Sequence, residues 1–264
     1  SIHFSIKSVF KANLHKRLKD IINLKEISLK NKTFNGQNLW SKAKHIIPGG
    51  SMLLSKSADR YLPDFWPTYF KSAKGCKIKD FDQNTYIDLS LMGVGTNVLG
   101  YANNQIDNEA KKNISKSNMS TLNCKEEITL AEKLIELHPW SHMVRFARSG
   151  GEANAVAIRI ARAASNRDNV AFCGYHGWHD WYLSTNLNNK EGSKNLDSHL
   201  IKGLKVDGVP KNLKKTVFPF VYGDMKGLNK LVKEKNIGTI KMEICRNTKP
   251  NKVFLRHIRK ICNE

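Results

Sequence analysis

The sequence lacks long apolar runs, closely spaced cysteines and low-complexity linkers. None of its apolar runs approaches the ~18 residues that a membrane-spanning helix requires, so we expect no membrane partner. The five cysteines are widely separated and odd in number, which argues against a zinc ribbon and a disulfide scaffold. We therefore expect reduced thiols, a cytoplasmic protein and no metal site. The cysteines are Cys76, Cys124, Cys173, Cys245 and Cys262.

The first segment lacks the features of a secretory signal. Residues 1–32 are basic and amphipathic, and they contain neither an uninterrupted apolar stretch nor a small-residue cleavage site. An exposed helix over residues 6–29 is the simpler interpretation, and a transit peptide is the alternative.

Acidic residues are scarce, with 23 Asp and Glu against 44 Lys and Arg, which gives a formal net charge of +21. Such a balance raises affinity for phosphate backbones. However, the lysines are spread almost evenly along the chain, and no helix-turn-helix, zinc-finger or RNA-recognition signature accompanies them. A solvated lysine-rich surface explains the charge more simply, so we expect no nucleic-acid partner. A basic binding protein is the competing interpretation.

The apolar content, 40% of 264 residues, suffices for one large α/β domain or two ordinary ones. Residues 37–47 read as a helix that ends at Pro48-Gly49-Gly50. Alternating residues between 75 and 90 predict a hairpin of two strands around a polar turn at 82–84. Beyond it, strands at 143–147, 169–173, 216–221 and 239–244 alternate with helices at 104–117, 126–137, 152–164, 225–235 and 253–262. This alternation predicts a mostly parallel sheet covered on both faces.

Two features of this pattern are unusual. Residues 186–214 form a long irregular stretch, and such loops are usually functional or inserted. After the helix at 253–262 the alternation calls for another strand, so we expect the sheet to be incomplete at the C-terminus.

The run from Arg148 to Asn154 follows a predicted strand and opens a helix. Gly150 and Gly151 expose backbone N–H groups at the positive end of the helix dipole, which suits a phosphate. Ser149 belongs to the same turn, and its alternative role is to cap the helix.

A second cluster, Phe172 to Trp181, gathers aromatic and imidazole groups directly after a predicted buried strand. The carboxyl edge of a parallel sheet is where ligands bind. His176, His179 and Asp180 are metal-ligand types, but no further ligand stands at a convincing spacing. A platform for a planar ring, formed by Tyr175 or Trp178, fits the composition better. The alternative is aromatic packing beneath a loop.

In this order and separation, the two clusters resemble class III aminotransferases, and most of all the group similar to glutamate-1-semialdehyde 2,1-aminomutase. The resemblance covers residues 39–264. Further matching segments are Ile47-Pro48-Gly49-Gly50, the hairpin Gly75 to Leu89, Leu99-Gly100-Tyr101, Arg159-Ile160-Ala161-Arg162 and Met242-Glu243.

The resemblance implies a type I fold of pyridoxal 5′-phosphate (PLP) enzymes, with three αβα layers and a mostly parallel sheet. It implies an N-terminal helical segment and small-domain hairpin over residues 1–90, and a large PLP-binding domain over 91–264. A homodimer is expected for the full-length enzyme. By position, Ser149, Gly150 and Gly151 would hold the phosphate, and the ring would contact Tyr175, His176 and Glu243.

The implied chemistry passes an amino group from a small-molecule donor to a carbonyl acceptor through an external aldimine, with the cofactor as electron sink. Two departures from the family pattern qualify it. The aspartate that pairs with the pyridine nitrogen and the Schiff-base lysine have no counterpart, so no catalytic residue is assigned. We therefore expect an enzyme fragment that is inactive alone. The alternative is a non-catalytic remnant that binds PLP or a partner protein.

The second departure concerns the substrate. Where aminomutases carry an arginine after Pro-Gly-Gly, this chain has Lys56, which keeps the charge without the planar fork. Lys56 and Trp178 are the candidate substrate contacts, and a transaminase acting on another carbonyl compound fits as well as an aminomutase.

Overall fold

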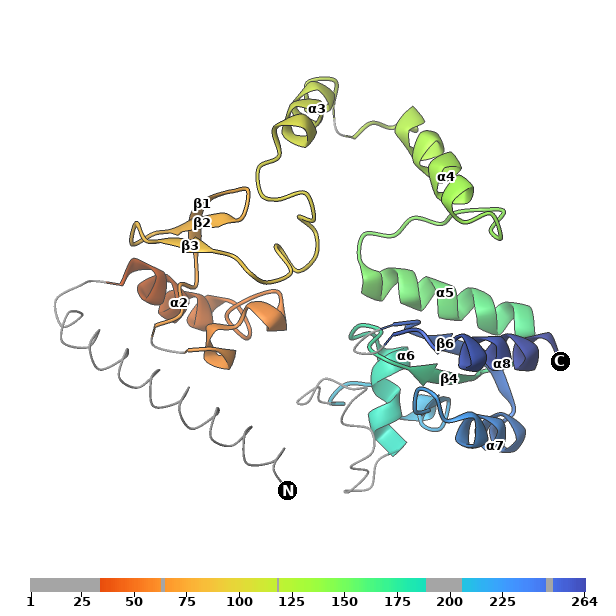
Figure 1. Cartoon of the computed structure of the whole chain (residues 1–264). Coiled ribbons are helices and arrows are strands. Elements are labelled where there is room, and N and C mark those ends of the chain that lie inside the picture. Colours follow the sequence, from red (N-terminus) through yellow and green to blue (C-terminus); the bar gives the residue numbers. More distant parts are fainter. Residues whose placement is uncertain (1–33, 63–64, 118, 189–205, 246–248) are drawn as a thin grey trace, which may run out of the picture. The chain divides into compact units, whose positions relative to one another are not determined.

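The computed structural model in Figure 1 describes residues 34–62, 65–117, 119–188, 206–245 and 249–264. The chain divides into two compact units, Ser1–Asn123 and Cys124–Glu264. The helix expected over residues 6–29 and most of the irregular stretch after residue 186 lie outside the described residues. The functional division at residue 90 remains a prediction.

The first unit contains a three-stranded antiparallel sheet in the order β1-β2-β3. The predicted hairpin is confirmed, because Lys77 pairs with Ile87 and Lys79 with Thr85. Strand β1 was not expected as a separate strand. The elements are α2 (Asn35–Ile46), η1 (Leu54–Lys56), η2 (Ala58–Arg60), β1 (Phe70–Lys74), β2 (Lys77–Asp80), β3 (Thr85–Ile87) and α3 (Asn104–Ile114).

Two aspartates hold the hairpin turn in place. The carboxylate of Asp80 is buried and accepts hydrogen bonds from the Asn84 backbone N–H at 2.8 Å and from the Tyr86 hydroxyl at 3.0 Å. Burial, and then the bond to Asp80, raise the pKa of Tyr86 to about 12. Asp82 accepts a bond from the Asn35 backbone N–H at 2.8 Å and so caps α2, whose own N-cap residue has no side-chain acceptor.

The apolar core of the first unit is small. Trp40 and Ala43 of α2 pack against Ala58, with Tyr69 alongside. Helix α3 buries none of its residues within the structure. The hydrogen bonds to Asp80 and Asp82 at the hairpin turn add to this small core.

The second unit contains a parallel sheet in the order β5-β4-β6, as the alternation of strands and helices predicts. In register, Val170 of β4 lies between Val217 of β5 and Thr239 of β6. The elements are α4 (Lys125–Leu137), α5 (Gly150–Ser165), β4 (Asn169–Cys173), α6 (Asp180–Leu183), η3 (Ser184–Asn188), η5 (Lys211–Leu213), β5 (Val217–Pro219), α7 (Met225–Lys235), β6 (Ile237–Met242) and α8 (Lys252–Asn263).

The strand predicted at residues 143–147 is wrong. These residues pair with no other strand in the described part of the chain, and only Val144 among them is even partly buried. Alternation of apolar residues is not sufficient for a strand, because the backbone also needs a neighbouring strand with which to exchange hydrogen bonds.

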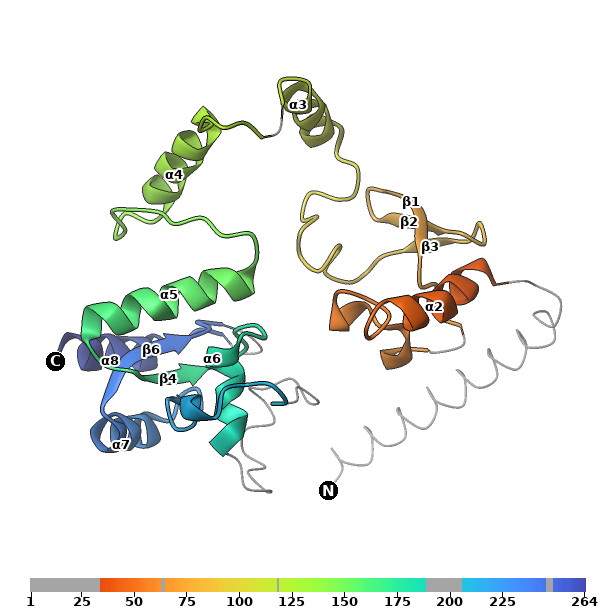
Figure 2. The same cartoon turned by 180° about the vertical axis from the view of Figure 1, so that it is seen from behind.

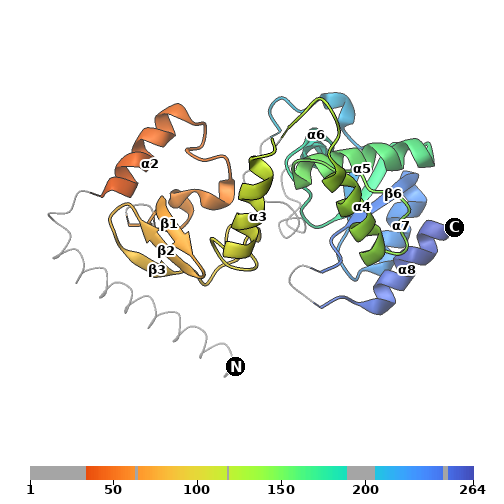
Figure 3. The same ribbon diagram turned by 90° about the horizontal axis from the view of Figure 1, so that it is seen from above.

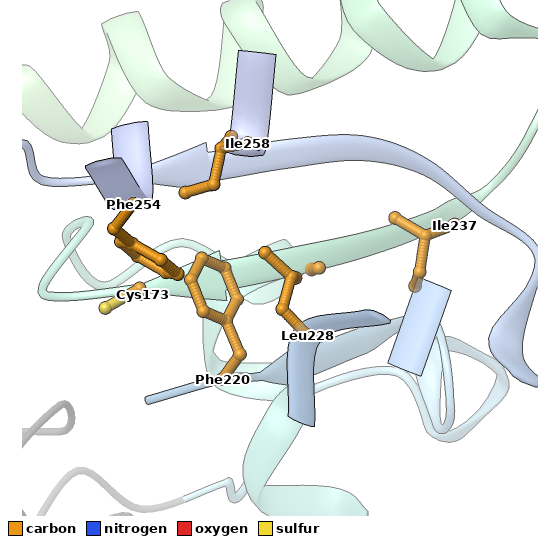
Figure 4. Close-up of a cluster of buried hydrophobic side chains, with 7 residues drawn as sticks. Cys173, Phe220, Leu228, Ile237, Phe254 and Ile258 are labelled. Carbon is orange, nitrogen blue, oxygen red and sulfur yellow. The ribbon is translucent and has the colours of Figure 1, made fainter. Parts of the chain in front are cut away.

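Helices cover both faces of the parallel sheet. Phe172 of β4 packs with Ile158 of α5 and Tyr182 of α6 on one face, and α5 runs along the sheet in both side views (Figures 1 and 2). Ala171 and Cys173 face the other way and meet the core shown in Figure 4, which contains Phe220 and side chains of α7 and α8. The three-layer arrangement expected from the sequence is therefore confirmed.

Helices α7 and α8 lie next to each other, as the view from above shows (Figure 3), and His257 of α8 lies 2.8 Å from the side-chain oxygen of Asn229 of α7. Figure 4 shows Leu228 of α7 and Phe254 of α8 turned toward Phe220. Among the described strands, β6 lies at one edge of the parallel sheet, and most of its residues are only half-buried. No helix among the described residues is long and apolar enough to cross a bilayer.

Candidate functional site

The carboxyl ends of β4 and β6 meet, because Cys173 pairs with Met242 at the end of the parallel ladder. The Glu243 backbone N–H donates to the Cys173 carbonyl at 3.0 Å. Gly174 has a φ of +97°, and a Cβ placed on it would lie 2.8 Å from Cγ of Glu243. Glycine is therefore required at this position, and it allows the Glu243 side chain to lie against the end of β4.

Helix α5 begins at the predicted phosphate turn. The Ser149 hydroxyl oxygen accepts a bond from the Glu152 backbone N–H at 3.2 Å, so Ser149 is the helix cap that the sequence offered as its alternative role. The Glu152 carboxylate turns back and accepts a bond from the Arg148 backbone N–H at 2.8 Å. Within the described ranges, no acceptor lies on the backbone N–H groups of Gly150 and Gly151. They are two donors available to a ligand.

The turn after β4 packs directly against this helix start. Gly177 has a φ of +102°, and a Cβ on it would lie 3.0 Å from the Gly151 Cα. A Cβ on Gly151 would lie 2.9 Å from Cδ2 of His179. The Asn154 side-chain amide donates to the His176 carbonyl at 3.2 Å and ties the turn to α5. The fold thus brings together the two clusters that the sequence singled out.

Tyr175 and His176, two of the ring-bearing residues of this turn, differ in exposure. Tyr175 is half-buried, with its ring edge-on to that of Tyr182 at 5.9 Å. His176 is 3% exposed, and its Nε2 lies 3.0 Å from the Cys173 carbonyl oxygen. The rings of Phe172 and Tyr182 contact it edge-on. Tyr175 is therefore partly accessible, whereas His176 supports the turn from within.

The proposed substrate residues lie in different compact units. Trp178 is 66% exposed and stacks on His179 with ring centroids 4.8 Å apart. Lys56 ends η1 in the first unit and is exposed. The assignment of both residues to substrate remains a prediction. No three His, Cys, Asp or Glu side chains gather as a metal site in the part of the chain that the structure describes.

Sequence reasoning missed Asn154 and His179 as contacts between the two clusters, and it gave Lys241 no role. Lys241 of β6 is half-buried and pairs in register with Phe172. Burial lowers the pKa of Lys241, and the nearby Glu243 carboxylate opposes that shift. The signal for Lys241 in the sequence is a charged residue within a strand that has no other charge.

The chain matches the class III aminotransferase family over residues 62–264 and belongs to that family. Among its curated relatives, 3-aminobutyryl-CoA aminotransferase of Cloacimonas acidaminovorans is 30% identical over 76% of this chain and 44% of the relative. Glutamate-1-semialdehyde 2,1-aminomutase of Methanobrevibacter smithii is 31% identical over 86% of this chain and 52% of the relative. The resemblance predicted from the sequence is therefore confirmed.

Solved structures agree on the fold. An omega-transaminase from Sphaerobacter thermophilus superimposes with a TM-score of 0.73 at 22% identity, over 87% of this chain and 52% of that one. A glutamate-1-semialdehyde aminomutase from Pseudomonas aeruginosa gives 0.66 at 16% identity, over 86% and 49%. The chain spans about half the length of the curated relatives it matches. Family membership supports PLP, the cofactor that the resemblance implies.

Proposed function

We propose that this chain forms the phosphate- and ring-binding part of a PLP-dependent transaminase or aminomutase similar to glutamate-1-semialdehyde 2,1-aminomutase. The observation that carries the proposal is the pair of N–H groups on Gly150 and Gly151, which lack acceptors within the described residues. They stand at the start of a 16-residue helix, beside a turn that presents an aromatic ring.

The start of α5 fits a phosphate group. Its two unbonded amides and the positive end of the helix dipole both favour an anion. The Ser149 oxygen already accepts a bond from Glu152, and its hydroxyl hydrogen is left to donate to a phosphate oxygen. Because Gly151 has no side chain, the His179 ring can lie close to the backbone at the start of α5, next to the two amides.

The ring of the cofactor would lie toward Tyr175, His176 and Glu243. Tyr175 offers a half-buried aromatic face for stacking, and buried His176 holds the turn that carries it. Glu243 lies against Gly174 at the end of β4, where its carboxylate would accept a hydrogen bond from the polar edge of the ring. When bound, PLP supplies an electron sink for a substrate carbanion.

The finer features of the function follow from the family pattern. The enzyme to which this sequence belongs would be a cytoplasmic homodimer that exchanges an amino group between a small-molecule donor and a carbonyl acceptor. Lys56 and Trp178 would contact the substrate. None of the lysines in residues 1–264 stands in a context that resembles the family's Schiff-base lysine, so the chain alone would be inactive. Transamination by the chain above the rate of free PLP would contradict this.

A pair of alanine substitutions tests the phosphate site. In Gly151→Ala the new Cβ meets His179 and crowds the site, so we expect PLP affinity to fall by about tenfold or more. In the matched control Gly150→Ala the Cβ meets nothing within 4 Å and the N–H is kept, so PLP affinity should stay within about threefold. Absorbance titration with PLP measures both. An unmodified chain that takes up no PLP, or equal effects of the two variants, would refute the site.

A further inference from the structure

Helices α7 and α8 carry a concentration of positive charge. Helix α7 contains four lysines and one glutamate, and α8 contains four Lys and Arg residues and no acidic residue. Helix α4 of the same unit has the opposite balance, with four glutamates and two lysines. The positive charge of the second unit is therefore unevenly distributed, and this pair of helices holds much of it.

Seven of these eight cations lie on the side of the helices that faces away from the sheet. Leu228 of α7 and Phe254 of α8 are fully buried in the core of the unit. A side chain two residues before, two residues after or five residues after a buried one points to the opposite side of an α-helix. In both helices all three of these positions are cationic, and Lys260 adjoins them. This basic face consists of Lys226, Lys230, Lys233, Lys252, Arg256, Arg259 and Lys260, all of which are exposed.

The two rows of cations form one surface. Helices α7 and α8 lie next to each other (Figure 3), and His257 contacts Asn229 between the rows. The Asn251 backbone N–H, just before α8, donates to the Tyr222 hydroxyl, just before α7, at 3.0 Å. The helices therefore start side by side and run in the same direction. Each row is about 10 Å long, and packed helix axes lie about 8–10 Å apart, so the basic face measures roughly 10 Å in each direction.

Most charges of the basic face are not neutralised by the protein. Among the described residues, only Lys230 and Lys260 of this face have a carboxylate within 4.0 Å, namely Glu234 and Glu264. Both are exposed pairs at 3.9 and 4.0 Å, and such pairs contribute little. Cations within each row stand three or four residues apart, where like charges destabilise a helix. A bound polyanion would relieve this repulsion.

The chemistry of the face favours a nucleic acid over a membrane or a protein. A helix that lies on a membrane buries its apolar side in lipid, but the apolar sides of α7 and α8 are buried in the core of the unit. The exposed large apolar residues of the two helices are Met225 and Val253, and neither is aromatic. A protein partner would require such anchors, because exposed ion pairs alone provide little affinity. A phosphate backbone requires only cations, since binding releases its condensed counterions.

We propose that the basic face of α7 and α8 binds a nucleic acid duplex through its phosphate backbone, whatever the base sequence. This revises the expectation of no nucleic-acid partner, because even spacing of lysines along the chain does not show which cations share a face. About 10 Å of duplex carries roughly six phosphate charges, of which about three can face one protein surface. The proposal does not depend on PLP binding at Gly150 and Gly151.

The test is fluorescence anisotropy of the 264-residue chain with two labelled DNA duplexes of unrelated sequence, at several salt concentrations. We expect both duplexes to bind alike, with a slope of log affinity against log salt of about −3. Lys226→Gln together with Arg256→Gln removes one cation from each row. At about 0.1 M salt this double variant should bind about tenfold more weakly or less, and its slope should be shallower by about 2.

A matched control removes the same net charge elsewhere. Lys111→Gln together with Lys125→Gln neutralises exposed lysines of α3 and α4, and affinity should stay within about threefold. Helix content by circular dichroism and uptake of PLP should be unchanged in both double variants, because the substituted side chains are exposed and lie outside the proposed cofactor site.

Several results would overturn the proposal. If neither duplex binds, the basic face is not a phosphate-backbone site. If the two double variants weaken binding equally, binding follows the net charge of the chain and not this face. Tighter binding to phosphatidylserine vesicles than to the duplexes, lost when Lys226 and Arg256 are replaced, would assign the face to a membrane. Displacement of the duplex by poly-L-glutamate at equal charge concentration would assign it to an acidic protein.

Discussion

The two compact units stabilise their small sheets in different ways. Four of the five residues of β4 in the second unit are buried, whereas no residue of β1 in the first unit is. The second unit packs apolar side chains on both faces of its sheet. The first unit relies on a small core around Trp40 and on aspartate hydrogen bonds at the hairpin turn.

This difference favours the second unit as the place for a ligand site. The densely packed second unit fixes the end of β4 and the start of α5, and precise positions are what a phosphate and a flat ring require. The first unit has only a small apolar core, and hydrogen bonds to the buried Asp80 carboxylate hold its hairpin turn, so loss of this one acceptor should lower its stability. Two substitutions test this comparison.

The largest expected effect is on the second unit. Phe172 is fully buried and contacts His176 and Tyr182 edge-on. Phe172→Ala should reduce the free energy of unfolding by about 3–5 kcal/mol, because it leaves a cavity under the aromatic turn. Urea unfolding followed by circular dichroism measures the loss. The control Phe146→Ala removes a ring that is 41% exposed and should cost less than about 1 kcal/mol. Equal losses would contradict the description of this core.

A smaller effect is expected in the first unit. Asp80→Ala leaves the Asn84 N–H and the Tyr86 hydroxyl without their acceptor, and it should cost about 1–3 kcal/mol. Hydrogen exchange of the β2 and β3 amides should accelerate accordingly. Asp107→Ala in the first turn of α3 is the control and should cost about 0.5 kcal/mol. Unchanged exchange in Asp80→Ala would show that the hairpin does not depend on this carboxylate.

Much of the fold could be predicted from periodicity. Helix α7 has the predicted bounds, and β4 matches the predicted strand. Local patterns fail where pairing decides the structure. Residues 143–147 alternate like a strand but find no partner, and β1 pairs with β2 although its residues are mostly exposed. Whether a partner strand lies alongside depends on the whole chain and is invisible in a short window.

The candidate site shows the same limit. The glycines at 150 and 151 and the aromatic turn could be found from the sequence, because strand-to-helix junctions have a recognisable chemistry. The contacts between Gly174 and Glu243, and between Gly151 and His179, join residues far apart in the chain. The basic face of α7 and α8 likewise joins cations that the sequence spreads along the chain. Such relations appear only after folding.

The most direct test of the account is the amide NMR spectrum of the 264-residue chain as PLP is added. The ¹⁵N and ¹H signals of Gly150 and Gly151 should shift strongly, because their N–H groups become donors to the phosphate. Gly227 serves as an internal reference, since it also lies in the first turn of a helix but already donates to Asp224 at 2.9 Å. Its signal should stay in place, and pyridoxal without phosphate should leave all three unmoved. PLP binding that leaves Gly150 and Gly151 unshifted would contradict the proposed phosphate site.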